Sequence, residues 1–445
     1  MEDNKKLNIV MFPWLAFGHM LPFLQLSKRL ATKGHHIFFV STPRNLKRLP
    51  NIPENLAPLI TLVPLPLPRV ENLPPNAEAT TDVGFSMGFD LLKKAYDGLQ
   101  DPMKLFLENS VTTYPLDWII YDFSCYWLPP IAEKLGIQKA FFSVFGARML
   151  TILGPLSQDN GPAADSFTNA EFLTTPPPWI PFPKSTVYFL PYEDFFSDLI
   201  VVRGCLELEG EYLQLVDKLI AEKTVLPVGL LPPSMEESPE DEVHNSIFGW
   251  LKKQRSGSVV YVALGSEVEP SQEQLTELAL GLELSKLPFL WAFRRSTGSS
   301  ADLPDGFVER TQDHGLVWMS WAPQLKILQH DSVGGFLTHA GFSSIIETLM
   351  FGKPLIMLPL MVDQGINARF MVEIRVGVEI PRNKEDGSFT RSSVAQSLTL
   401  VLKDEAGKMY RDEAKKYKPV IANESLHGQY IDKFINHLIN YKFET

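Results

Sequence analysis

The chain has 445 residues, of which 45% are hydrophobic and 21% charged, and its formal net charge is −11. This length exceeds what one ordinary hydrophobic core organises, so we expect two domains, and the composition is that of a folded globular protein. The acidic balance argues against nucleic acid as a partner, because nucleic-acid binding depends on Lys and Arg side chains that neutralise phosphates.

Signals for secretion and membrane insertion are not found in the sequence. The first residues, MEDNKKLNIVMF, lack the cationic-then-apolar layout of a signal peptide. No apolar run approaches the roughly 20 residues that span a bilayer. The two cysteines, Cys125 and Cys205, support neither a disulfide framework nor a zinc site. We therefore expect a cytoplasmic protein without a membrane span.

The first elements predict an open α/β domain. Leu7–Phe12 is an apolar run typical of a buried strand, the spaced leucines of residues 21–33 predict a helix that ends before Gly34, and His36–Ser41 predicts the next strand. This order predicts a doubly wound parallel sheet, whose ligands bind outside the carboxyl ends of the strands.

Two polar residues stand at predicted strand ends. His19 lies in the loop after the first strand, and Asp122 follows Trp118–Tyr121, a second buried strand. A carboxylate that accepts the Nδ1–H of an imidazole fixes its tautomer, so that Nε2 can act as a general base. The alternative is a hydrogen-bonded loop histidine and a helix-capping aspartate, neither with a catalytic role.

Beyond Phe142 the sequence predicts irregular structure, because the run TTPPPWIPFP (174–183) is rich in proline. The segment is also aromatic, which favours an apolar pocket wall for a bulky organic ligand, although a loop packed on the core explains each aromatic equally well. The aromatic residues are Phe141, Phe142, Phe145, Trp179, Phe182, Tyr192, Phe195 and Phe196.

A second α/β domain is predicted after the linker-like segment Leu230–Asn245, which joins a proline pair to an acidic run. Val259–Leu264 is its first buried strand and ends at the small-residue turn Gly265-Ser266-Glu267. The expected domains are residues 1–235 and 255–425, joined by 236–254, with 426–445 a terminal helix packed back on the first domain. Further predicted elements are a helix that starts with 247–252, helices capped by Ser271 with Gln274 and by Thr390, helices near 363 and over 430–438, and strands at 289–293, 316–319 and 355–358.

The segment Val333–Gly352 predicts a strand, a turn and a helix that opens at Ser343-Ser344. The first N–H groups of such a helix favour an anion, most often a phosphate, and His339 adds a donor. A sugar-nucleotide diphosphate site is one interpretation, and an ordinary capped helix is the other. The two domains predict a cleft, with His19 and Asp122 on one wall; the other wall would carry Ser266, Trp321, His339 and Asp363.

Trp321–Gln364 resembles the signature of plant UDP-sugar-dependent glycosyltransferases. PWLAFGHMLPFLQLSKRLATKGHHIFFVSTPRN, VVYVALGSE and PRNKEDGSF resemble the subgroup that adds a further sugar to a glycoside, so the likeness covers essentially the whole chain. It implies the GT-B fold, two Rossmann-like domains facing a cleft. It also implies inverting transfer, by a monomer, from a UDP-sugar to a hydrophobic small-molecule glycoside such as a terpenoid, steroid or flavonoid glycoside. No metal or other cofactor is implied, and the chain has no DxD pair.

The resemblance also implies site residues. His19 is the implied base and Asp122 its orienter. Trp321 would stack on uracil, with Ala322 and Gln324 near the base and ribose, and Glu347 would accept hydrogen bonds from the ribose. The diphosphate would be held by Ser266, His339, Ser344 and the helix start at Gly341, Phe342 and Ser343; the sugar would be held by Asp363 and Gln364; and the acceptor pocket would be lined by Phe17, Phe123, Phe145 and Phe182.

Residues 339–344 read HAGFSS where the family usually has HCGWNS. Ala340 is a packing change, Phe342 lacks the indole N–H, and Ser343 shortens a side chain that approaches the phosphate. These departures bear on donor affinity and donor sugar. The Asp363-Gln364 ending favours glucose over galactose, and UDP-rhamnose is the alternative donor.

Three other classes compete with this interpretation. A Rossmann oxidoreductase needs a GxGxxG turn, which PWLAFGHM lacks. Gly84-Phe85-Ser86-Met87-Gly88 matches the hydrolase pattern GxSxG, but polar residues precede it rather than the buried strand that a nucleophile elbow requires. A catalytically weak sugar-nucleotide-binding protein is the third, which Phe342 and Ser343 make conceivable.

Overall fold

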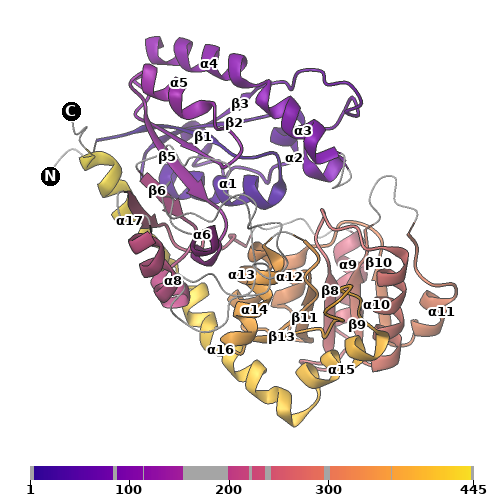
Figure 1. Cartoon of the computed structure of the whole chain (residues 1–445). Coiled ribbons are helices and arrows are strands. Elements are labelled where there is room, and N and C mark those ends of the chain that lie inside the picture. Colours follow the sequence, from indigo (N-terminus) through magenta and orange to yellow (C-terminus); the bar gives the residue numbers. More distant parts are fainter. Residues whose placement is uncertain are drawn as a thin grey trace. The chain divides into compact units, whose positions relative to one another are not determined.

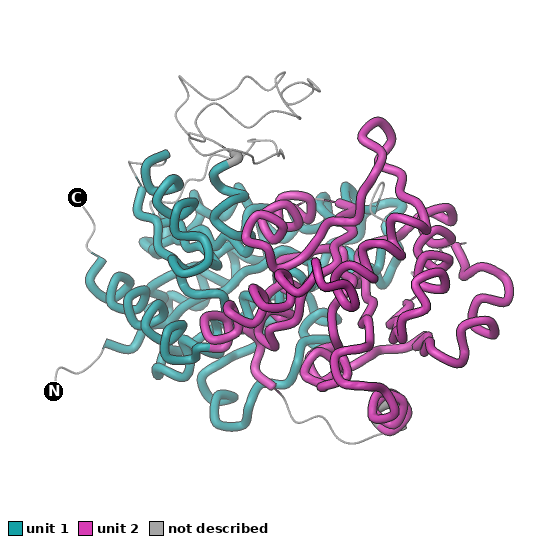
Figure 2. Tube along the Cα trace, turned by 90° about the horizontal axis from the view of Figure 1, so that it is seen from below, with its two compact units in different colours: residues 1–231, 423–445 teal, residues 232–422 magenta. Residues whose placement is uncertain are grey.

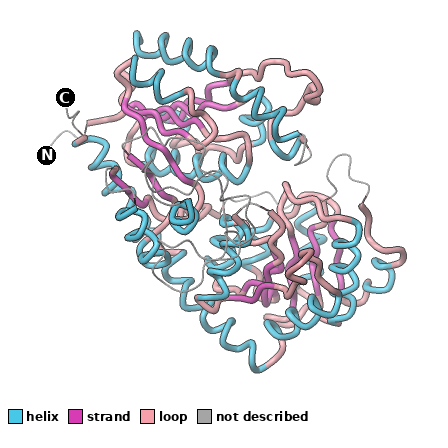
Figure 3. The backbone as a smooth tube through the Cα atoms, in the orientation of Figure 1, coloured by secondary structure: helices cyan, strands magenta, loops and turns pink. Residues whose placement is uncertain are grey.

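The computed structural model describes residues 5–83, 88–113, 115–153, 199–219, 223–235, 242–294, 301–361 and 363–441. The chain divides into two compact units (Figure 2). Unit 1 comprises Met1–Leu231 and Asn423–Thr445, and unit 2 comprises Pro232–Ala422. In each unit helices pack around strands (Figures 1 and 3).

The described part of unit 1 contains a seven-stranded parallel sheet with the order β3-β2-β1-β4-β5-β6-β7. The order reverses between β1 and β4, and in doubly wound sheets ligands bind at such a reversal, outside the carboxyl ends of the strands. The strands are β1 (Asn8–Phe12), β2 (His36–Ser41), β3 (Ile60–Pro64), β4 (Trp118–Tyr121), β5 (Gln138–Ser143), β6 (Leu199–Val202) and β7 (Thr224–Pro227).

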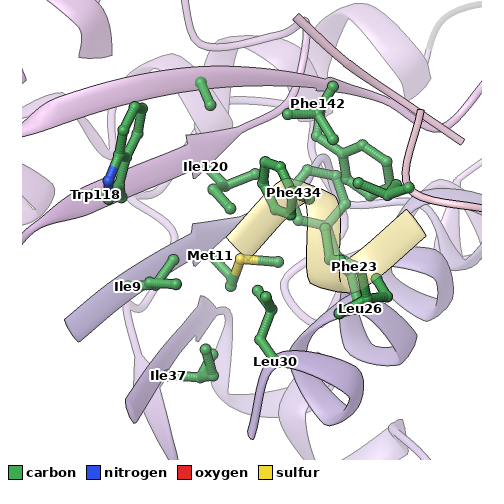
Figure 4. Close-up of a cluster of buried hydrophobic side chains, with 14 of the residues drawn as sticks. Ile9, Met11, Phe23, Leu26, Leu30, Ile37, Trp118, Ile120, Phe142 and Phe434 are labelled. Atoms are coloured by element: carbon green, nitrogen blue, oxygen red, sulfur yellow. The ribbon is translucent and has the colours of Figure 1, made fainter. Parts of the chain in front are cut away.

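Side chains of β1 alternate between two packed faces, as the strand period of two requires. Met11 lies in a buried cluster with Phe23 and Phe434 (Figure 4), whereas Phe12 stacks on Tyr96 with a centroid distance of 5.1 Å. Both faces of the sheet are therefore buried under helices. The helices of unit 1 are α1 (Phe17–Thr32), α2 (Pro43–Arg48), α3 (Gly88–Asp97), α4 (Gln100–Thr113), α5 (Leu128–Lys134), α6 (Ala147–Leu153), α8 (Leu206–Leu219) and α17 (Glu424–Asn440).

The described part of unit 2 contains a six-stranded parallel sheet with the order β10-β9-β8-β11-β12-β13. This order reverses between β8 and β11. The strands are β8 (Val259–Ala263), β9 (Phe289–Ala292), β10 (Gly315–Trp318), β11 (Val333–Thr338), β12 (Leu355–Met357) and β13 (Gly377–Glu379).

Two helices of unit 2 begin with the predicted side-chain caps. The Ser271 hydroxyl accepts a hydrogen bond from the Gln274 N–H at 3.2 Å, and the Thr390 hydroxyl accepts one from the Ser393 N–H at 3.1 Å. The helices are α9 (Glu242–Leu251), α10 (Gln272–Ser285), α11 (Phe307–Thr311), α12 (Gln324–Gln329), α13 (Phe342–Met350), α14 (Gln364–Glu373), α15 (Arg391–Leu402) and α16 (Lys408–Ile421).

The two doubly wound sheets confirm the α/β fold class, but several local predictions were wrong. Helix α1 begins at Phe17 rather than at residue 21, so His19 lies in its first turn and not in a loop. The chain beyond Phe142 is not irregular throughout, because α6, β6, α8 and β7 lie there. Helix α9 includes residues that were assigned to the linker, and α17 begins six residues before the predicted start at residue 430. None of the helices in the described ranges has the length and apolarity needed to cross a membrane.

Candidate functional site

Each unit brings polar side chains to the point where its strand order reverses. In unit 1, Phe12 of β1 pairs with Tyr121 of β4, so the loop after β1 passes beside Asp122. In unit 2, Ala263 of β8 pairs with Thr338 of β11, so the turns after these strands are neighbours. Ligands of doubly wound sheets bind at such positions.

In unit 1 the His19 imidazole lies against the Asp122 carboxylate. Nδ1 of His19 is 2.8 Å from Oδ2 of Asp122, although 103 residues separate them. The Asp122 side chain is 2% exposed, and the imidazole of His19 is 12% exposed. A buried carboxylate at this distance fixes the tautomer in which Nδ1 carries the proton and Nε2 accepts one.

Backbone donors hold Asp122 in place. The Trp14 N–H donates to Oδ2 at 3.0 Å, and the Phe123 N–H donates to Oδ1 at 2.8 Å. Both oxygens are thus fixed by the two loops that follow β1 and β4, which leaves the carboxylate little freedom to turn away from His19. Helix α5 begins at Leu128, so Asp122 does not cap it.

Aromatic rings surround the other side of His19. The ring centroids of Phe123 and Phe145 lie 5.5 Å and 5.2 Å from that of His19, and Phe145 meets it edge to face. Phe17, in the first turn of α1, is half-buried. The structure thus brings Phe123 and Phe145 to the imidazole, while Phe182 lies outside the described residues.

In unit 2 two glycines allow the backbone to approach His339 closely. An added Cβ at Gly265 would lie 2.8 Å from Cε1 of His339, and one at Gly341 would lie 2.5 Å from its Nε2. Gly265 also has a φ of +79°, in the left-handed region. The turns after β8 and β11 therefore pack on the two sides of one imidazole only because both positions are glycine.

The His339 imidazole is neutral near pH 7. Desolvation lowers its pKa to about 4, and its Nδ1 lies 3.3 Å from Oγ1 of Thr338. A neutral imidazole can donate a hydrogen bond to an anion without the repulsion that a second fixed cation at the site would add. An incoming diphosphate would favour the protonated form and raise the pKa.

A helix begins beside His339, and a helix N-terminus is a place that favours an anion. Helix α13 begins at Phe342, one residue before the predicted Ser343, and Gly341 is its N-cap without a side-chain cap. The first N–H groups of a helix have no partner within the helix, and the helix dipole places positive charge there. Ser343 and Ser344 add half-buried hydroxyls in this first turn.

Asn367 ties this turn to the next loop. Its Nδ2 donates to the Ala340 carbonyl at 3.1 Å and to Oδ2 of Asp363 at 2.8 Å. Ala340 itself is buried with a φ of +66°, a conformation that favours glycine or a small polar residue. Asn367 thus fixes both the unusual backbone before α13 and the Asp363 carboxylate.

Gln364 is more constrained than the sequence prediction implies. Its Oε1 accepts hydrogen bonds from the N–H groups of Leu360 and Met361, at 2.9 and 3.0 Å, and its side chain is largely buried. The carbonyl oxygen is therefore used to shape the loop after β12. Its Nε2 is the group that could contact a sugar hydroxyl.

The predicted nucleoside residues also meet one another. Nε2 of Gln324 donates to Oε2 of Glu347 at 2.6 Å, and its Oε1 accepts from the Tyr261 hydroxyl at 3.3 Å. The Trp321 side chain is 64% exposed, which is unusual for so large an apolar group and suits a stacking platform. Ala322 packs on the hydrophobic cluster of β8 and β11, and Ser266 is exposed after β8.

The sequence prediction assigned no role of their own to three residues that shape these sites. Gly265 follows a buried strand in a small-residue turn, a pattern that predicts positive φ and could have been found. Asn367 lies inside a helix, where its contact with Ala340 depends on tertiary packing. Tyr261 alternates with apolar residues in β8 and carries no separate signal.

Comparisons with known proteins identify relatives of this chain in sequence and in fold. A family model described as UDP-glucoronosyl and UDP-glucosyl transferase matches residues 238–420. The chain is 48% identical to UDP-glycosyltransferase 91D2 of Stevia rebaudiana, over 98% of this chain and 96% of that protein. It is 40% identical to soyasaponin III rhamnosyltransferase of Glycine max, over 100% and 98%. In fold it resembles the crystal structure of Arabidopsis thaliana UGT89C1 complexed with UDP-L-rhamnose, with a TM-score of 0.77 at 24% identity over 98% of this chain and 99% of that one.

Proposed function

Because this chain belongs to the plant family 1 UDP-glycosyltransferases and has their GT-B fold, we propose that it transfers a sugar, with inversion, to a hydroxyl of a glycoside. The acceptor would be a hydrophobic small molecule that already carries a sugar. The contact that carries this proposal is the 2.8 Å hydrogen bond between His19 and the buried Asp122. It supplies a general base, which transfer to a hydroxyl requires and simple nucleotide binding does not.

His19 would act on the acceptor. The acceptor oxygen attacks the anomeric carbon as its proton passes to Nε2 of His19, and the bond between that carbon and the UDP oxygen breaks. Asp122 stabilises the imidazolium that forms, because its buried carboxylate stays hydrogen-bonded to Nδ1. General-base assistance of this kind contributes typically about 10² to 10⁴-fold.

Unit 2 would hold the donor. Trp321 offers a face to uracil, and the Gln324–Glu347 pair offers polar groups to the base and ribose. The diphosphate would lie at the start of α13, where the backbone N–H groups of Ser343 and Ser344 and the side chain of His339 can donate to it. UDP gains negative charge as it leaves, and donors fixed in advance stabilise that charge.

The donor sugar would contact Asp363 and Gln364. We propose glucose as the donor sugar. Rhamnose is the alternative, because the Glycine max relative is named a rhamnosyltransferase. Asn367 holds Oδ2 of Asp363, and the N–H groups of Leu360 and Met361 hold Oε1 of Gln364, so both side chains are restrained where they would meet the sugar. Such a rigid pair favours one hydroxyl pattern over another.

The acceptor would lie against Phe17, Phe123 and Phe145 beside His19. These rings give an apolar wall for the aglycone, and saponins such as the substrate in the name of the Glycine max relative join an apolar body to sugars. Cys125 and Cys205 are buried thiols and not members of a disulfide framework, which fits a reducing compartment, so we propose the cytosol as the site of this reaction.

One donor panel tests this proposal. UDP-glucose and UDP-rhamnose are each incubated with terpenoid, steroid and flavonoid glycosides, and products are identified by mass and linkage. We expect transfer from one donor to a sugar hydroxyl of the acceptor. In the same assay His19→Ala should lower turnover by at least about 10²-fold, because the base is lost, while UDP affinity stays unchanged.

Two negative outcomes of this experiment would have different meanings. Retained turnover in His19→Ala would remove the base assignment but not the family. UDP binding without transfer from either donor to any acceptor would instead support a catalytically weak sugar-nucleotide-binding protein.

A further inference from the structure

We propose that the buried ion pair between Arg148 and Glu209 is a positioning device for catalysis, which holds Phe145 edge-on against His19. This inference rests on the proposed role of His19 as the base. It concerns the connection between β5 and α6, residues 144–146, which links the ion pair to the aromatic ring. Arg148 and Glu209 act through that connection and do not touch the reacting atoms.

The ion pair is fully enclosed within unit 1. Nη1 of Arg148 donates to Oε1 of Glu209 at 2.7 Å, and the two side chains are 1% and 0% exposed. The backbone N–H of Arg148 approaches the same oxygen at 3.4 Å. One carboxylate thus binds both the side chain and the start of helix α6.

Glu209 reaches this place because its helix is kinked. Its φ of −128° and ψ of 29° are not helical, so α8 is broken at this residue. The hydroxyl of Tyr430 accepts the Leu206 N–H at 2.9 Å and donates to the Glu207 carboxylate at 2.9 Å. The C-terminal helix α17 therefore fixes the first turn of α8 that carries Glu209.

The carboxylate also packs against the backbone on two sides. A Cβ added to Gly146 would lie 2.5 Å from Oε1 of Glu209, and one added to Gly204 would lie 3.1 Å from Oε2. Gly146 directly follows Phe145. The position of the carboxylate therefore sets the position of the peptide next to the aromatic residue.

Phe145 is held on its other side as well. The Ser143 hydroxyl donates to the Phe145 carbonyl at 3.2 Å, so the backbone is fixed on both sides of the ring. The ring then meets the His19 imidazole at a centroid distance of 5.2 Å and an interplanar angle of 82°. Asp122 fixes Nδ1 of that imidazole, and Phe145 limits how the ring can tilt about this hydrogen bond.

A purely stabilising role explains this arrangement poorly. Enclosing two charges costs solvation, and well-packed apolar residues often stabilise a core equally well or better. An ion pair also fixes the position of its carboxylate, because the carboxylate must lie where the guanidinium and the α6 N–H groups converge. In this protein that position determines where the backbone of Gly146 and Phe145 lies, next to His19.

Glu209→Gln tests the inference. The amide keeps the shape and one acceptor oxygen but loses the charge, so the β5–α6 connection should loosen. We expect kcat/KM for the acceptor to fall by about 10 to 100-fold, as small misplacements near a reacting group do. The KM for the UDP-sugar should not change. The acid limb of the pH profile of kcat/KM should also change, because the imidazole is held less firmly between Asp122 and Phe145.

Glu133→Gln is the matched control. Glu133 makes a 2.8 Å ion pair with Lys139 of β5 in the same unit, but its side chain is 72% exposed. The same substitution there removes an ion pair without touching the β5–α6 connection. Kinetics and pH profile should remain those of the wild type.

A double variant tests whether Glu209 acts on His19 through Phe145. In a Phe145→Leu background the proposed link to His19 is already cut, so Glu209→Gln should add no further loss of kcat/KM. Additive losses would overturn the inference, and so would an unchanged pH profile in a folded Glu209→Gln protein. If that variant does not fold, Arg148→Lys, which keeps the charge on a shorter side chain, is compared in the same two backgrounds. If His19→Ala retains turnover, the base assignment fails first; if only the double-variant comparison fails, the base assignment stands.

Discussion

At the scale of single residues, burial determines the charge of His339. The imidazole is enclosed by Gly265 and Gly341, and desolvation lowers its pKa from 6.5 to about 4. The unfolded chain therefore takes up a proton near pH 6.5, whereas the folded chain does so only near pH 4. Between these values the unfolded state binds more protons, so this residue lowers stability as the pH falls.

A pH series on His339→Gln tests this linkage. We expect the wild type to lose more unfolding free energy than the variant between pH 7 and pH 5, by at most about 1.4 kcal/mol for each pH unit within the window. Calorimetric unfolding at the two pH values measures both proteins. Parallel losses would mean that His339 is not kept neutral by the fold.

Residue pairs were predictable where the topology brings strand ends together. His19 and Asp122 each follow a buried run, and a doubly wound sheet places the loops after β1 and β4 side by side. The buried ion pair of Arg148 with Glu209 was not predictable, because Gly210 can mark the kink inside α8 but tertiary packing decides which side chains the kink brings together.

At the scale of elements, the turn between β11 and α13 depends on the absence of side chains. The backbone passes so close to His339 that a Cβ at Gly341 would lie 2.5 Å from its Nε2. Asn367 fixes the preceding carbonyl, so the turn cannot yield by moving as a whole. The imidazole must move instead, away from the start of the helix.

Gly341→Ala should therefore weaken UDP binding. We expect at least a tenfold rise in the Kd for UDP. We also expect a loss of about 1 to 3 kcal/mol of unfolding free energy, which is the usual cost of overpacking a buried site. Titration calorimetry and thermal unfolding measure the two. The matched control is Gly249→Ala in α9 of the same unit, where an added Cβ meets nothing within 4 Å. Equal UDP affinity in both variants would contradict the proposed site.

The predicted boundaries of helices and strands were wrong where the usual sequence signals for their ends are missing. Ala16, the N-cap of α1, makes no side-chain cap, Gly18 disfavours helix, and Pro22 stands inside the helix, so the sequence pointed to a later start. Strand β6 has the apolar sequence LIVV, yet the proline-rich run before it led the prediction to extend irregular structure across it. The capping boxes of α10 and α15, in contrast, were readable from their side chains.

At the scale of the whole molecule, the chain enters unit 2 after Leu231 and leaves it after Ala422. Helix α17 then completes the core of unit 1. Phe434 is fully buried in that core, and the Leu438 carbonyl accepts the Trp118 indole N–H at 3.2 Å. The stability of the unit that carries His19 thus depends on residues at the other end of the sequence.

Phe434→Ala should destabilise unit 1 selectively. We expect a loss of about 3 to 5 kcal/mol, as for other buried aromatic truncations, with weaker acceptor turnover near the unfolding temperature. UDP binding, which we place in unit 2, should persist at temperatures where transfer is lost. The exposed Asn436→Ala in the same helix is the control. Loss of both functions at one temperature would mean that the units unfold together.

The overall architecture was the most predictable level. Short buried runs that alternate with helical patterns predict parallel sheets, and both sheets are present. The surroundings of the proposed acceptor were least predictable from the residues alone, because the neighbours of rings such as Phe123 and Phe145 are set by tertiary contacts.

The return of α17 to unit 1 has a consequence for biosynthesis. The strands of unit 2 lie in one continuous stretch of chain, so this unit can close as soon as the stretch has left the ribosome. The earlier-made unit 1 must wait, because Ile431, Phe434 and Leu438 of its core are translated after all of unit 2. Unit 1, which carries the proposed base, is therefore translated first but completes its core last. Until α17 has been made, the apolar side chains that it will cover are exposed and need protection from aggregation.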